Sequence, residues 1–67
     1  MKNNIKDLRT KFNLTQAQLA DKLYVSRQTV NAIEKGKFDP SLPLAFKISQ
    51  LFQKPIEEIF EWEEENI

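Results

Sequence analysis

The stretch TQAQLADKLYVSRQTVNAIEKG, residues 15–36, decides the fold because it carries two sets of helix boundary signals in succession. Thr15 and Gln18 have the spacing of a capping box, in which each side chain accepts a hydrogen bond from the other residue's backbone N–H. Ser26 is a favourable N-cap for a second helix, and Gly36 suits the left-handed position that follows a helix end. The stretch therefore predicts two short helices joined by a tight turn, over residues 16–23 and 27–35.

Three further helices are predicted to surround this pair. Asn4 is a suitable cap for the first helix, and Ser41, with Pro43 in the first turn, for the fourth. Pro55 disfavours helical geometry at Lys54, so the fourth helix should stop before Lys54 and a short fifth helix should start at the proline. Apolar residues at helical spacing form the predicted core: Ile5, Leu8, Phe12, Leu19, Leu23, Val25, Val30, Ile33, Leu44, Ile48, Leu51 and Phe52. We therefore expect one all-α domain over residues 1–67.

The composition excludes several kinds of chemistry. The chain has no cysteine, which excludes disulfides, and no histidine, which is the commonest metal ligand and neutral-pH general base. Its sequence contains no nucleophile–base pair and no glycine-rich phosphate loop. We therefore expect no enzyme and no metal, cofactor or small-molecule site. At this length a single core supplies about 3–5 kcal/mol, so self-association is the expected additional support.

Charge is distributed unevenly along the chain although the net charge is zero. Residues 1–54 hold all ten Lys and Arg with only four acidic residues, for a net charge of +6. Residues 55–67 hold six Glu and no basic residue, for −6. A basic body could attract a polyanion, although charge alone fits a solvated surface equally well. No apolar run approaches the roughly 20 residues of a membrane span, and no signal-peptide pattern is present, so a cytoplasmic protein without a membrane partner is expected.

The predicted third helix has an outward face with the chemistry of base recognition. If Val30 and Ile33 point inward, Arg27, Gln28 and Asn31 share the outward face with Lys35. Arginine is a bidentate donor to guanine, and glutamine matches the donor–acceptor pair of adenine. An ordinary solvated helix face is the alternative, and it would be favoured for an isolated Arg-Gln pair. Two capped helices at this spacing fit a helix-turn-helix, whose second helix enters the major groove, and so favour DNA recognition.

The same residues carry a family resemblance. The segment LTQAQLADKLYVSRQTVNAIEKGKFDPSL, residues 14–42, resembles the helix-turn-helix of phage repressor and Cro-like regulators, the Xre family. The resemblance extends over roughly residues 5–60, and the whole chain is similar to short stand-alone members, which are five-helix dimeric transcription regulators. In some members the two chain ends pair as a small antiparallel sheet, for which Met1–Asn3 and Glu61–Glu65 are available here.

The resemblance implies a role for each matching position. Arg27 and Gln28 would read bases, with Asn31 as a further candidate. Arg9 and Glu34 would form an ion pair that ties the first helix to the third. Tyr24 stands where many members have glycine in the turn, which would cost about 1–2 kcal/mol if its φ is positive. Phosphate contacts are expected at the helix starts and after the third helix, from Thr15, Gln16, Ser26, Thr29, Lys35 and Lys37.

The acidic segment, residues 55–67, is the predicted dimerisation segment. Two helix-turn-helix units that read a palindrome need their recognition helices about 34 Å apart, so the seam should lie away from residues 27–35. Phe60 is expected to turn into the monomer core. Ile56 and Ile59 are the apolar candidates for the seam, together with Trp62, which fits a dimer seam and the edge of the core about equally.

These observations predict a homodimeric repressor that binds double-stranded DNA at a palindromic operator. The alternative is an antitoxin or adaptor of the same fold, in which the basic face is incidental and the C-terminal part binds another protein. The salt dependence of binding to duplex DNA distinguishes the two.

Overall fold

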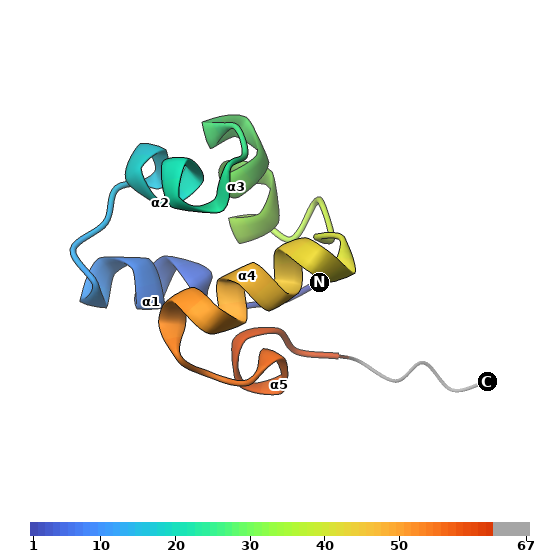
Figure 1. The fold of residues 1–67 in the computed structure, drawn as a ribbon. Helices are drawn as coiled ribbons and strands as arrows, with labels where there is room; N and C mark the ends of the chain where they lie inside the picture. Colours follow the sequence, from blue (N-terminus) through green and yellow to red (C-terminus); the bar gives the residue numbers. More distant parts are fainter. Residues whose placement is uncertain (63–67) are drawn as a thin grey trace.

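The computed structural model describes residues 1–62 and contains five α-helices in succession (Figure 1). The helices are α1 (Ile5–Lys11), α2 (Gln16–Leu23), α3 (Arg27–Glu34), α4 (Leu42–Phe52) and α5 (Ile56–Ile59). In Figure 1, α2 and α3 lie together above α1 and α4, and α5 lies at the opposite end of the molecule from α2 and α3. The predicted all-α fold and its five helices are confirmed. Helix α3 ends one residue earlier than predicted, with Lys35 as its C-cap.

Three of the predicted N-caps form the expected hydrogen bonds. Thr15 Oγ1 accepts from the backbone N–H of Gln18 at 3.1 Å, and Gln18 Oε1 accepts from the N–H of Thr15 at 2.9 Å, which completes the capping box. Ser26 Oγ accepts from the N–H of Thr29 at 3.1 Å, and Ser41 caps α4 in the same way. These bonds satisfy N–H groups that have no partner inside a helix, and this explains why α2, α3 and α4 begin where they do.

The start of α1 differs from the prediction. Asn4 occupies the N-cap position, but its side chain makes no capping hydrogen bond and instead donates to the backbone oxygen of Glu58 at 3.1 Å. The neighbouring Asn3 supplies an acceptor, because its Oδ1 lies 3.2 Å from the N–H of Ile5. Asn3 therefore supplies the acceptor at the start of α1, and Asn4 binds the backbone of α5 instead.

Several turns use left-handed backbone geometry. Gly36 has φ +75°, and a Cβ added there would meet the backbone oxygen of Met1 at 3.4 Å, so glycine suits the position for both conformation and space. Asn13, which follows α1, has φ 57°, and Gln53 at the end of α4 has φ 56°. Tyr24 has φ 58° and ψ 41°, so the turn of the helix-turn-helix contains the strain that its sequence predicted.

The core lies where all five helices meet. Its buried residues are Ile5, Leu8, Leu19, Ala20, Leu23, Val30, Ile33, Leu44, Ala45, Ile48, Phe52, Ile59 and Phe60. Val25 and Leu51, which were predicted in the core, are partly buried and pack against it. Phe12 packs edge-on against Phe52, with ring centroids 5.2 Å apart, although nearly half of its side chain is exposed. Within residues 1–62, no helix is both long and apolar enough to span a membrane.

Residues 2–4 and residues 59–61 lie side by side in antiparallel orientation. Asn3 and Phe60 form an isolated bridge, the N–H of Glu61 donates to the oxygen of Lys2 at 2.8 Å, and the N–H of Asn4 donates to the oxygen of Ile59 at 3.0 Å. The described residues therefore contain one bridge between the ends and no sheet. Part of the segment predicted to pair, residues 63–65, lies outside the described residues.

Candidate nucleic-acid interface

Packing against α2 fixes which side of α3 faces solvent. Val30 and Ile33 are each only 2% exposed, and they point into the core that they share with Leu19 of α2. The first residues of α3, Arg27 and Gln28, are consequently exposed. The first turn of a helix also presents backbone N–H groups without intrahelical partners and carries a partial positive charge. This end of α3 can therefore offer side-chain donors and acceptors together with a site for an anion.

The hydroxyl groups at the start of α3 are connected to each other. Ser26 Oγ lies 2.9 Å from Thr29 Oγ1, in addition to its capping bond. Ser26 is exposed and Thr29 partly buried. Because each hydroxyl has a single proton and one of the two protons is used in their mutual bond, only the hydroxyl that accepts in that bond can still donate to a phosphate oxygen.

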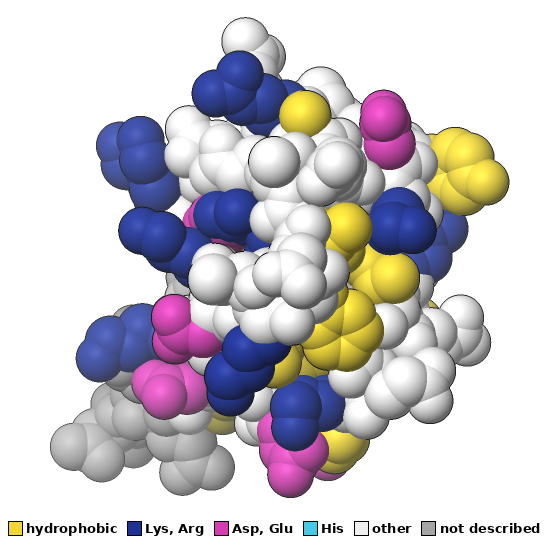
Figure 2. Space-filling view, turned by 90° about the vertical axis from the view of Figure 1, so that its left-hand side faces the viewer, with side chains coloured by type: hydrophobic (Ala, Val, Ile, Leu, Met, Phe, Trp, Pro, Cys, Tyr) yellow, Lys and Arg dark blue, Asp and Glu magenta, His cyan; other side chains and the backbone are white. Residues whose placement is uncertain are grey.

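The start of α2 lies beside the start of α3. A shallow groove is lined by residues of α1, the connection between α1 and α2, the first turn of α2, and Arg27 of α3, and among its lining residues are Thr15 and Gln16. Figure 2 looks onto the side of the molecule that carries this connection, and Lys and Arg side chains are prominent along its left-hand edge. The groove brings the predicted phosphate contacts of α2 next to a predicted base-reading residue.

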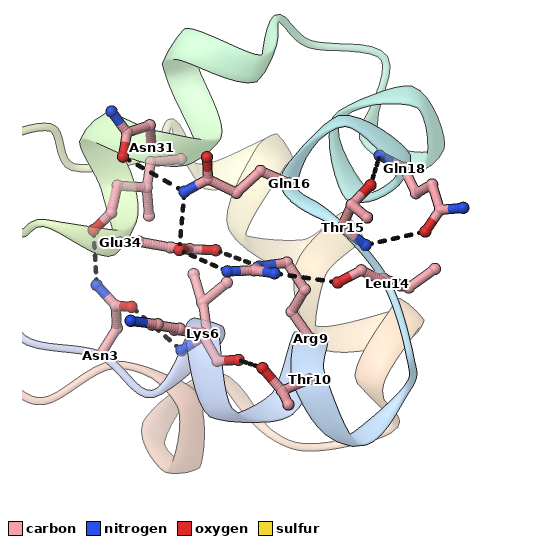
Figure 3. A network of polar contacts seen from close by, with 12 residues as sticks. Asn3, Lys6, Arg9, Thr10, Leu14, Thr15, Gln16, Gln18, Asn31 and Glu34 are labelled. Atoms are coloured by element: carbon pink, nitrogen blue, oxygen red, sulfur yellow. Dashed lines mark hydrogen bonds and ion pairs between the residues drawn. The ribbon is translucent and has the colours of Figure 1, made fainter.

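A polar network joins α1, α2 and α3 behind this groove (Figure 3). Arg9 and Glu34 form a two-point ion pair, with Nε 2.7 Å from Oε2 and Nη2 3.2 Å from Oε1. Their side chains are 14% and 6% exposed, so the pair is largely buried. Arg9 Nη1 also donates to the oxygen of Leu14 at 3.1 Å. The network therefore ties α3 to α1 and to the chain segment that leads into α2.

Gln16 belongs to the same network. Its Nε2 donates to Asn31 Oδ1 at 3.3 Å and to Glu34 Oε1 at 3.1 Å. Gln16 was predicted to bind phosphate and Asn31 to read bases, and the structure brings these two side chains into contact with each other. In the free protein, the amide donors of Gln16 are directed into the network rather than toward solvent.

The hydrogen bond to Glu34 raises the pKa of Arg9 above its ordinary value. The negative charge of Glu34 raises this pKa further, and burial of the guanidinium opposes both effects. A raised pKa on a basic group adds stability that is fully present below the group's unfolded-state pKa and is lost progressively as the pH rises from that value through the folded-state pKa. The guanidinium therefore stays charged, and its contribution stays constant, throughout the neutral and moderately alkaline range.

The segment after α3 carries two exposed basic residues. Lys35 and Lys37 flank Gly36, and their side chains are exposed, as a role in gripping the DNA backbone requires. The end of α3 is held by Asn3, whose Nδ2 donates to the oxygen of Ile33 at 2.8 Å. Sequence reasoning missed this contact because its partners are 30 residues apart. The only local signal was a pair of asparagines before α1, where a single cap was expected.

The structure corrects one residue of the predicted dimer seam. Ile59 is 1% exposed and belongs to the monomer core, so it has almost no surface to offer a partner. Phe60 is buried, as expected. Ile56 is partly buried and Trp62 is 76% exposed, and these two remain candidates. The reason is geometric, since α5 is only four residues long and its last residues turn back toward the N-terminal segment.

Comparison with known proteins agrees with this geometry. A helix-turn-helix family model matches residues 5–59. An uncharacterized HTH-type transcriptional regulator of Methanocaldococcus jannaschii is 60% identical, over 97% of this chain and 98% of its own length. The cryptic phage CTXphi transcriptional repressor of Vibrio cholerae is 34% identical, over 97% of this chain and 59% of its own length. An HTH-type transcriptional activator of Enterococcus faecalis is 43% identical, over 90% of this chain and 29% of its own length.

The family match begins at the start of α1 and ends with α5, so it includes both helices of the motif and the network behind them. The chain therefore belongs to the helix-turn-helix family of Xre and Cro/C1-like transcription regulators.

Proposed function

We propose that the protein is a homodimeric, sequence-specific repressor that reads a palindromic operator through the major groove. The observation that carries the proposal is the start of α3, where Arg27 and Gln28 are exposed directly after the Ser26 cap. In this role the two side chains contact base edges. Asn31 lies one turn further along α3 and is a third candidate for base contact. The proposed activity is binding, in the cytoplasm, without catalysis.

Phosphate contacts would orient the protein on the duplex. The first turns of α2 and α3 supply Thr15, Ser26 and Thr29, and Gln16 would contribute through its backbone N–H, because both of its side-chain donors are held in the network. The segment after α3 supplies Lys35 and Lys37. Such contacts fix register and add affinity without carrying sequence information. Two protomers related by a two-fold axis would place two such surfaces on half-sites about one turn of DNA apart.

Selection of bound sequences from a pool of random duplexes tests the proposal. A palindromic consensus supports a dimer that reads two half-sites, and a pool that stays random contradicts sequence-specific binding.

Arg27→Ala or Gln28→Ala should then cost about 1–3 kcal/mol of binding free energy on the selected site and relax the base preference at one base pair per half-site. If Arg27→Ala leaves affinity and base preference unchanged, the assignment of the reading face is wrong.

The backbone contacts have a different signature. Lys37→Ala should weaken binding to all duplexes alike and reduce the slope of log affinity against log salt by about one per monomer. Lys54→Ala is the matched control, because Lys54 is also exposed but precedes α5, which lies at the opposite end of the molecule from α3 (Figure 1). An equal change in salt slope for both variants would indicate general attraction by the basic body and contradict the placement at Lys37.

Repression is the proposed sign of regulation. Relatives include one named as a transcriptional repressor and one named as an activator, and the second is much longer than this chain. Repression requires only that a bound dimer block a promoter, which suits a small DNA-binding unit. Transcription in vitro from a promoter that overlaps the selected site tests this, since repression lowers transcript with increasing protein and activation raises it.

A protein-binding module of the same fold, such as an antitoxin or adaptor, is the second candidate. The observation that favours it is an exposed apolar face on α4, where Leu42 is 66% and Phe46 is 53% exposed, four residues apart. This function predicts duplex binding that is weak and without sequence preference. The selection experiment therefore separates the two candidates.

A further inference from the structure

The side chains of Arg9, Glu34, Gln16 and Asn31 form a chain of hydrogen bonds whose direction is fixed at one end. Arginine has donors only, and a carboxylate has acceptors only. Arg9 donates to both oxygens of Glu34. Because the carboxylate can only accept, the group of Gln16 that lies 3.1 Å from Glu34 Oε1 has to be its NH2 group.

The same reasoning fixes the orientation of Asn31. The NH2 group of Gln16 also lies 3.3 Å from the Asn31 amide, so the Asn31 atom that faces it has to be the acceptor, Oδ1. This removes the usual ambiguity between amide oxygen and nitrogen. Asn31 consequently turns Nδ2 away from the network, as Figure 3 shows. Among residues 1–62, no atom accepts a hydrogen bond from Asn31 Nδ2. Every buried side-chain nitrogen and oxygen in this range has a partner, so Nδ2 is not buried and is open to solvent.

We propose that Gln16 is a positioning residue for specificity, which holds the Asn31 amide so that Asn31 offers DNA a donor and thereby selects guanine over cytosine. The proposal rests on the DNA-binding function proposed above and deepens it. In the major groove guanine presents two acceptors, O6 and N7, whereas cytosine presents the N4 donor. Adenine places a donor beside its N7 acceptor and is intermediate. One neutral hydrogen bond corresponds to about a 2- to 12-fold difference in affinity.

This role is distinct from a phosphate contact by Gln16. A residue that contacts only phosphate weakens binding to all duplexes by the same factor when it is removed. A residue that orients a base-reading side chain alters the relative affinities for different bases at one position of the site. Base preference is therefore the quantity to measure.

The sharpest variant is Asn31→Asp. Aspartate has nearly the same shape, keeps an acceptor for Gln16 Nε2, and replaces the outward NH2 group with an oxygen. The added negative charge should weaken binding to every duplex. Beyond that uniform loss, we expect the guanine preference at one base pair per half-site to change to a cytosine preference, because a carboxylate accepts from cytosine N4.

The second variant removes the positioning residue itself. Gln16→Ala leaves the Asn31 amide free to turn, so the guanine preference at that same base pair should shrink toward equal affinity for the four bases. The double variant Gln16→Ala/Asn31→Ala should show the same base preference as Asn31→Ala alone. Lys37→Ala serves as the control, since it should weaken all duplexes while keeping the base preference.

The experiment is selection from random duplexes with wild type and each variant, followed by titration of four duplexes that differ only at the affected pair. The inference is overturned if Gln16→Ala weakens all four duplexes by one factor, or if Asn31→Asp still prefers guanine, while the DNA-binding function stands. A wild type that selects no sequence at all overturns the proposed function and the inference together. Circular dichroism identifies any variant that fails to fold, in which case the remaining variant decides.

Discussion

At the scale of single residues, the ion pair between Arg9 and Glu34 is the most consequential contact outside the apolar core. Glu34 accepts from both Arg9 and Gln16 and is 6% exposed at its side chain. Replacing Glu34 with alanine leaves the Arg9 charge largely buried without its partner. Removal of one partner of a buried pair costs about 3–5 kcal/mol, and a domain of this size has about 3–5 kcal/mol in total. We therefore expect the free energy of unfolding of Glu34→Ala to be near zero, so that a large fraction of the protein is unfolded at 25 °C.

Thermal melts followed by circular dichroism measure this loss, and Asp21→Ala is the matched control. Asp21 is an exposed acidic residue of α2, and its replacement should change the free energy of unfolding by about 0.5 kcal/mol or less. A melting temperature for Glu34→Ala within a degree or two of wild type would mean that the pair contributes little net stability.

The residue scale is also where the sequence was least informative. The sequence correctly placed Phe60 in the monomer core but offered both Ile56 and Ile59 for the dimer seam, because a single helical turn covers too small an arc to separate them. The hydrogen bond from Gln16 to Asn31 could not be predicted from the sequence either. It joins residues 15 positions apart, to which separate roles had been assigned. The pairing of Arg9 with Glu34 was expected only from the family resemblance.

At the scale of elements, the N-caps offer a test that separates stability from binding. Ser26 and Ser41 cap α3 and α4 with similar hydrogen bonds, of 3.1 and 3.3 Å. Loss of either cap should lower the free energy of unfolding by about 1 kcal/mol. Only Ser26 lies at the proposed DNA surface, so Ser26→Ala should also weaken DNA binding, whereas Ser41→Ala should leave it unchanged. Equal losses of DNA affinity in the two variants would show that Ser26 acts only through the stability of its helix.

The turn between α2 and α3 permits a second test at this scale. Tyr24 has φ 58° and is 86% exposed, with the Lys47 amine 5.4 Å from its ring centroid. Glycine adopts positive φ without steric cost, while a β-branched residue is a poor fit there. Tyr24→Gly should raise the free energy of unfolding by up to about 1 kcal/mol, less the weak contact with Lys47, and Tyr24→Val should lower it. Urea titrations in which Val is as stable as Gly would rule out backbone strain at this turn.

Elements were predicted well because their signals are local. Helix boundaries depend on residues only a few positions away: a serine or threonine before an apolar repeat, a glycine after it, or a proline that ends it. The N-caps therefore predicted the starts of α2, α3 and α4 correctly. The N-cap of α1 was harder to predict from the sequence, because the Asn4 side chain binds the backbone of Glu58, 54 positions away, and the capping acceptor comes from Asn3. Contacts of this range depend on the completed fold.

At the scale of the whole molecule, the separation of charge has opposite consequences for the two proposed partners. The body, residues 1–54, carries +6 and should bind DNA less tightly as salt rises, because salt reduces the gain from releasing counterions. The segment 55–67 carries −6, and in a symmetric dimer two such segments would face each other near the two-fold axis. Salt screens that repulsion, so dimerisation should tighten as salt rises. Sedimentation equilibrium at several salt concentrations measures it, and a dimer that weakens with salt contradicts an acidic seam.

The position of the seam can be tested with single aspartate substitutions. With Ile59 buried, Ile56 and Trp62 are the remaining apolar candidates, and an added carboxylate at either one should be costly to desolvate in an interface and should repel its copy across the axis. We expect wild type to be dimeric at tens of micromolar, roughly the range of weak association, and Ile56→Asp and Trp62→Asp to sediment as monomers there. Leu42→Asp is the control, because Leu42 is 66% exposed but opens α4, fourteen residues before the first residue of α5. If Leu42→Asp alone dissociates the dimer, the seam lies on α4, and the acidic segment then serves to keep the C-terminal end away from phosphate.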